Sequence, residues 1–168
     1  MDTTLSQRLM RALALEPELF TEVGADATAT RQALLLVFGI VLLSGLGELP
    51  VRGAAGFLYE IALGCLGWSL WVVGIQATAH WLGYESELAP LFRALGFAAA
   101  PFLLGLFEEL PWIGELLRIL KWGVGIAAFG AAVRALLAVE WSTALLLVLV
   151  GLGSSILLCS PLLWLSPA

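Results

Sequence analysis

The charged residues of this chain stand in short clusters, and long apolar runs separate these clusters from residue 32 onward. A transmembrane helix needs about 20 mainly apolar residues to cross a hydrocarbon core of roughly 30 Å. Hydrophobic residues make up 61% of the chain and charged residues 12%, a composition far from that of a soluble domain. The pattern therefore predicts an integral membrane protein whose charges mark the ends of its helices.

The apolar runs predict an all-α fold in which five transmembrane helices form one bundle. The expected helices cover residues 32–49, 56–83, 91–109, 118–141 and 142–160. They make a single transmembrane domain, 32–168, which follows a cytoplasmic amphipathic segment, 1–31. No soluble domain is expected beside them.

Tryptophan and proline positions refine two of these helices. Trp122 and Trp141 are separated by about 28 Å of helix, so both indoles would lie at interfacial depth. Pro101 falls in the middle of the third helix and should kink it, because proline cannot donate the helical hydrogen bond. Residues 113–120 show helical spacing and either lie along the membrane surface or form the first turns of the fourth helix.

The segment before the first apolar run is itself amphipathic. Leu5, Leu9 and Leu13 share one helical face, while Arg8 and Arg11 lie off that face. This predicts an interfacial helix that anchors the N-terminus, and the alternative is a docking site for a partner protein.

Orientation follows from the arginines and lysines near the ends of the helices. Five fall on the side of the N-terminus and three on the other side, which favours a cytoplasmic N-terminus and a C-terminus outside. The chain has no asparagine, seven arginines against one lysine, and much alanine, glycine and leucine. That usage indicates a bacterial protein, so we expect a multi-pass protein of the bacterial cytoplasmic membrane.

Polar residues within the apolar runs are candidates for function, because such groups are costly in lipid. His80 is the only histidine and could ligate a haem or bacteriochlorophyll, although a bis-histidine haem within one chain is excluded. Glu60 is separated from His80 by about 30 Å of helix, so the two should lie at opposite interfaces. Arg134 either snorkels to an interface or pairs with an acid on another helix.

Motifs for catalysis are missing from the sequence. It holds no HExxH pair, no phosphate-binding glycine loop with lysine, no CxxC pair and no second histidine for a triad. Cys65 and Cys159 lie in apolar runs and suit packing better than ligation. We therefore expect a protein that is not an enzyme, has no metal, cofactor or nucleic-acid partner, and contacts the lipid bilayer and other membrane proteins.

Small residues recur along four of the runs, where they allow helix backbones to approach closely. They are Gly64, Gly67 and Gly74, then Gly96 and Ala100, then Gly123, Ala127, Gly130 and Ala131, and finally Gly151 and Ser155. They serve either internal packing or contact with other membrane proteins. Arg93, Gly96, Pro101, Gly123, Gly130 and Arg134 are the candidate structural positions, and Arg93 with the pair Glu108 and Glu109 are interpreted as boundary charges of the third helix.

One stretch resembles a known family. The run from Phe92 to Pro101 (FRALGFAAAP) is similar to the bacterial branch of the Yip1 domain family, which places Arg, Gly-aromatic-Ala and Pro here. The resemblance implies five transmembrane helices and a cytoplasmic N-terminus. Eukaryotic members bind small GTPases through an Asp-Leu-aromatic-Gly-Pro motif that this chain lacks, so GTPase binding is not expected.

Together these features favour a non-enzymatic membrane protein that organises or scaffolds other membrane components through helix contacts. A first alternative is an accessory subunit of a large energy-transducing complex, either respiratory or a photosynthetic reaction-centre or light-harvesting assembly. A second alternative is a small-solute transporter or channel.

Overall fold

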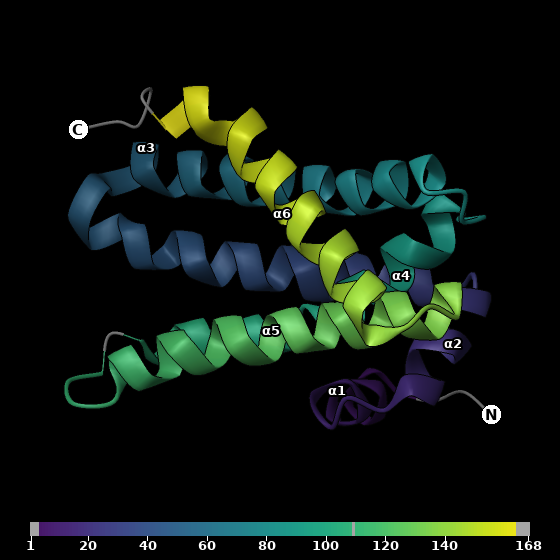
Figure 1. The fold of residues 1–168 in the computed structure, drawn as a ribbon. Coiled ribbons are helices and arrows are strands. Elements are labelled where there is room, and N and C mark those ends of the chain that lie inside the picture. Colours follow the sequence, from purple (N-terminus) through teal and green to yellow (C-terminus); the bar gives the residue numbers. More distant parts are fainter. Residues whose placement is uncertain (1–3, 109, 164–168) are drawn as a thin grey trace.

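The computed structural model describes residues 4–108 and 110–163, which are helical apart from short connections and contain no strand. The elements are α1 (Leu5–Leu13), α2 (Pro17–Ala25), α3 (Ala29–Trp81), α4 (Leu88–Ala98), the 3₁₀ helix η1 (Ala100–Phe107), α5 (Gly114–Leu137) and α6 (Trp141–Leu163). Figure 1 shows two antiparallel arms of α3, with α5 beside them, α6 crossing obliquely, and α1 and α2 at one end. The all-α class is confirmed.

The longest helix, α3, doubles back on itself at Gly53. This residue has φ 63° and ψ −159°, a conformation that is unfavourable for residues with a Cβ and accessible to glycine. The two arms then pack together: a Cβ at Gly45 would lie 3.2 Å from Cγ1 of Ile61, and one at Gly64 only 2.9 Å from Cγ1 of Val41. The bend therefore turns one long apolar segment into a helical hairpin.

Four helical segments within the described residues are long and apolar enough to cross a bilayer: Ala29–Trp81, Leu88–Phe107, Gly114–Leu137 and Trp141–Leu162. Five separate spanning helices are thus not confirmed, because the first two expected helices join into α3. Helix continues through Pro50, where an end was expected, and only Gly53 interrupts it. The expected limits at residue 109 and beyond residue 163 lie outside the described residues.

The third and fourth expected helices also have shifted ends. The change at Pro101 takes the form of a switch from the α4 helix to 3₁₀ geometry, with proline in the first turn of η1. Residues from Gly114 onward belong to α5, which agrees with the alternative that 113–120 form the first turns of the fourth helix. Helix α5 ends at Leu137 instead of Trp141, because Ala138 adopts the left-handed conformation with φ 51°.

Small residues hold α6 against the second arm of α3. A Cβ at Gly151 would lie 3.0 Å from both the backbone nitrogen of Ile75 and the carbonyl oxygen of Trp71. Ser155 donates a hydrogen bond of 2.7 Å to the carbonyl of Gly67, and the Trp71 indole donates one of 2.9 Å across the same interface. This contact leaves no room for larger side chains.

Two other small-residue positions differ from each other. Gly96 of α4 lies against Ala33 of α3, where an added Cβ would come within 2.7 Å of the alanine Cβ. Gly123 of α5 meets nothing within 4 Å among the described residues, so its proposed role in internal packing is wrong. It lies on an outer face of α5 because the neighbouring Gly125 takes the inward position against Phe102.

Alanine at Gly151 should destabilise the fold, because its Cβ would press on the backbone of α3. We expect a loss of about 1–3 kcal/mol in the free energy of unfolding, typical of overpacking. Gly153→Ala is the matched control, since Gly153 on the same helix has open space among the described residues. Thermal unfolding in detergent compares the two variants, and equal melting temperatures would contradict the packing argument.

Candidate functional site

A cavity lies between the two arms of α3, η1, α5 and α6, near the bend. Its outer part, which is nearer the bend, has a volume of about 490 Å³, and its inner part, which is farther from the bend, has about 350 Å³. Both parts are lined by Ile40, Ser44, Glu60, Phe102 and Lys121, so they adjoin. We call the two parts together the bend cavity. In Figure 1 the bend of α3 and the start of α5 lie at the same end, away from α1 and α2.

Charged side chains gather around the outer part of the bend cavity. Lys121 forms an ion pair with Glu108, with Nζ 2.5 Å from Oε1, and Arg118 lies 3.8 Å from the same carboxylate. Glu48 pairs with Arg52 at 3.5 Å. Glu60, by contrast, forms no hydrogen bond or ion pair with any residue that the structure describes.

Aromatic rings form the inner part. Trp71 and Phe129 stack with ring centroids 4.2 Å apart, and Phe102 meets each of them edge-on at 6.3 Å. Trp122 meets Phe102 edge-on at 5.3 Å, and Trp68 also lines this part. Because the Trp71 indole is hydrogen bonded to the backbone of α6, the aromatic wall is held in place from a second helix. The bend cavity therefore joins a charged outer part to an aromatic inner part.

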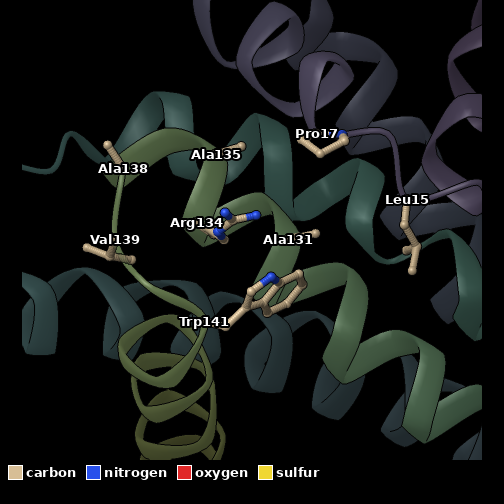
Figure 2. Close-up of a pocket in the computed structure, with 8 residues that line it drawn as sticks. All are labelled: Leu15, Pro17, Ala131, Arg134, Ala135, Ala138, Val139 and Trp141. Carbon is tan, nitrogen blue, oxygen red and sulfur yellow. The ribbon is translucent and has the colours of Figure 1, made fainter.

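A smaller cavity of about 290 Å³ lies at the opposite end, around Arg134. Figure 2 shows the Arg134 guanidinium beside the Trp141 indole, with Pro17 and Leu15 across the cavity. The guanidinium carbon is 5.5 Å from the ring centroid, a cation–π distance. Arg134 is exposed in the last turn of α5, so it does not lie deep within the fourth helix as its position before Trp141 suggested.

An ion pair of Arg134 with an acid on another helix, the alternative to snorkelling, is absent from the described residues. Its aromatic neighbour also explains Gly130, where an added Cβ would lie 3.0 Å from Cζ3 of Trp141. The short link after Ala138 brings Trp141 back over the end of α5. Sequence spacing could not show this, because it placed residues 134 and 141 on one continuous helix.

The N-terminal segment is held by buried charge. Arg8 is only 5% exposed, and its guanidinium lies 2.6 Å from Asp26 and 3.4 Å from Glu22, and donates a 2.9 Å hydrogen bond to Gln32. Arg11 pairs with Glu22, the oxygen lying 2.7 Å away. The predicted orientation of α1 is therefore wrong for Arg8, which faces the protein.

Two of the three leucines of α1 point outward in consequence, whereas Leu9 is partly buried and packs against the core. Leu5 and Leu13 are exposed, as is Met10, while Ala12 is buried. The acids after Pro17 fold back over α1 and turn its arginine face inward. An outward apolar face still suits the expected interfacial anchor, which stays a prediction.

Arg93 joins this end to the bundle. Its Nε donates to the carbonyl oxygens of Val23 and Gly24, each 3.1 Å away, and Nη2 also donates to Gly24. These carbonyls belong to the last turn of α2, where no helical amide is available to them. Arg93 is thus a C-terminal cap for α2, and its interpretation as a boundary charge stays a prediction.

Two charges of the N-terminal segment have shifted pKa values. The pKa of Asp26 is lowered to about 2, first by the Thr28 hydroxyl that donates to its carboxylate at 2.6 Å and then by Arg8. The pKa of Arg11 is raised by its hydrogen bonds to Glu16 and Glu22. Both shifts favour the charged forms that hold α1 in place.

Of the remaining sequence candidates, His80 lies apart from the bend cavity. His80 is exposed in the last turn of α3, so its role as a pigment or haem ligand stays a prediction. The described residues contain no group of three or more His, Cys, Asp or Glu side chains that could hold a metal ion. Glu109 lies outside the described residues, whereas Glu108 lines the bend cavity.

Lys121 is the residue that the sequence reasoning missed. It lines the bend cavity from the second turn of α5. Its ion pair with Glu108 joins α5 to the end of η1. The sequence feature that could have singled out Lys121 is that it is the only lysine in a chain with seven arginines. No protein-family model, curated protein or solved structure matches this chain.

Replacing Asp26 by asparagine should lower stability in a pH-dependent manner. The folded pKa of about 2 lies below the ordinary value of about 3.9, so the charged carboxylate stabilises the fold above about pH 4. That contribution is lost as the pH falls from about 4 to about 2. The difference in melting temperature between wild type and Asp26→Asn should therefore be largest near pH 6 and shrink below pH 4.

Glu18→Gln is the control for this measurement, because Glu18 is an exposed acid in the first turn of α2. It should leave the pH profile of the melting temperature unchanged. A constant difference between wild type and Asp26→Asn from pH 6 to pH 2 would contradict the assignment.

Proposed function

We propose that this chain is a five-crossing, non-enzymatic membrane protein that binds a small amphiphilic molecule in the bend cavity, as a binding protein or carrier. The observation that carries the proposal is Glu60, a carboxylate without a partner among the described residues that lines a cavity with aromatic walls. Ionisable groups within membrane helices are costly and mark binding or transport sites. The two parts of the cavity are each of the size that small-molecule sites have.

The five crossings are supported by the length of the two arms of α3. Residues 29–52 and 54–81 give helices of about 36 and 42 Å at 1.5 Å per residue. Each arm therefore exceeds the roughly 30 Å of a hydrocarbon core. With the N-terminus in the cytoplasm of a bacterium, as the arginine distribution favours, the charged part of the bend cavity faces the outside.

A membrane-organising role through lateral helix contacts is a second candidate. The open space at Gly123, together with that at Gly153, supports it, since backbone without side chains lets another helix approach. Most other small residues are already used in internal packing, so this candidate has less support than the cavity. The two roles are compatible, because the open glycines lie outside the cavity lining.

Cysteine labelling tests the number of crossings. In a background of Cys65→Ala and Cys159→Ala, single cysteines replace Val51 and Trp81, which are exposed beside the bend and at the end of α3. A membrane-impermeant maleimide should label Val51→Cys only from outside and Trp81→Cys only from inside. Labelling of both positions from one side would contradict a hairpin that crosses twice.

Photo-crosslinking tests binding in the bend cavity. An uncharged diazirine-bearing fatty alcohol should give saturable crosslinks to residues that line the cavity, on top of unsaturable labelling of lipid-facing helices. Ser44→Trp should fill the shared part of the cavity and remove the saturable labelling. Gly39→Trp is the matched control on the same arm, because Gly39 has open space among the described residues. If no saturable labelling is seen with the wild type, the proposed function fails.

A further inference from the structure

The net charge of the bend cavity follows from its pairs. Three carboxylates and one ammonium line its outer part. Glu108 and Lys121 neutralise each other, and Arg52 accompanies Glu48. Arg118, which lies 3.8 Å from Glu108, is balanced by Glu115 at 3.1 Å. One negative charge is left over, and it belongs to Glu60.

Glu60 lines both parts of the bend cavity, so its carboxylate stands between the charged outer lining and the aromatic inner lining. It lies seven residues beyond Gly53, which is about 10 Å along the helix. Aromatic faces attract cations through their quadrupole, and Trp is the strongest of them. Trp68 and Phe102 line the inner part, so a cation bound there would meet aromatic rings as well as Glu60.

We propose that the bend cavity selects an organic cation that carries an apolar body, such as an ammonium or phosphonium group with aromatic or alkyl substituents. The proposal rests on the proposed function, since it names the class of molecule that the cavity binds. The cationic centre pairs with Glu60, and the apolar body lies against the rings of the inner part. The pairing supplies the partner that the carboxylate lacks among the residues that the structure describes.

Other ligand classes fit this lining less well. An anion would meet Glu60 directly, and Lys121 is already engaged by Glu108 at 2.5 Å. A divalent metal ion requires about six oxygen ligands, which one free carboxylate does not provide. A neutral amphiphile would fill the aromatic part but leave Glu60 unpaired.

Two probes of matched shape and opposite charge test the inference. Tetraphenylphosphonium and tetraphenylborate are titrated into the full chain in lipid nanodiscs by isothermal calorimetry, with empty nanodiscs subtracted. We expect binding of the phosphonium and at least about tenfold weaker binding of the borate. Glu60→Gln should weaken phosphonium binding about tenfold, which corresponds to the loss of one charge contact.

Two further variants separate charge from folding. Glu60→Asp keeps the negative charge and should retain most of the phosphonium affinity. Glu87→Gln removes an exposed carboxylate before α4, outside the cavity lining, and should have no effect. Unchanged melting temperatures show that each variant is folded.

The outcomes distinguish this inference from the proposed function. Equal binding of both probes, or phosphonium binding unchanged by Glu60→Gln, overturns the selectivity for cations. Saturable crosslinking by the uncharged fatty alcohol would then still support the cavity as a binding site. If neither ion binds and the fatty alcohol gives no saturable labelling, both proposals fail.

Discussion

The bend at Gly53 is the constraint on which the rest of the structure depends. A positive φ at this residue reverses the chain after a long apolar helix and lays the second arm of α3 along the first. The arms approach closely because Gly45 and Gly64 leave space for the side chains opposite. Only after this reversal can α6 pack on the second arm and α4 on the first. The bend therefore determines where both α4 and α6 lie in the bundle.

Packing density differs between the two ends of the bundle. Around α4, residues 94–100 are buried without interruption, and Gly96 lets Ala33 approach within contact distance. Toward the bend, α4 is followed by the 3₁₀ helix η1, which starts at Ala100. Phe102 in η1 and Glu108 at its end line the bend cavity. The bend cavity begins where the well-packed half of this segment ends, at Pro101.

Charge is used in two different ways at the two ends. At the end of α1 and α2, the arginines Arg8 and Arg11 meet carboxylates within hydrogen-bonding distance, and the segment is fastened by these contacts and by the Arg93 cap. At the bend, Lys121 and Glu108 satisfy each other. Glu60 has no partner among the described residues, and this contrast is why the cavity, not the ionic cluster, suggests a ligand.

The sequence alone predicted the helical class, the apolar segments and the break at Pro101, because these depend on local composition and on the geometry of single residues. It could not determine which side of α1 faces inward, since Arg8 is buried only through acids that a reversal of the chain brings to it. It placed Arg134 well before the end of a helix that runs on to Trp141, because the left-handed Ala138 that ends α5 has no strong local signal. The joining of Glu60, Lys121 and Glu108 around one cavity was decided by tertiary structure alone, since it requires the bend of α3 and the turn before α5 to lie at the same end of the bundle.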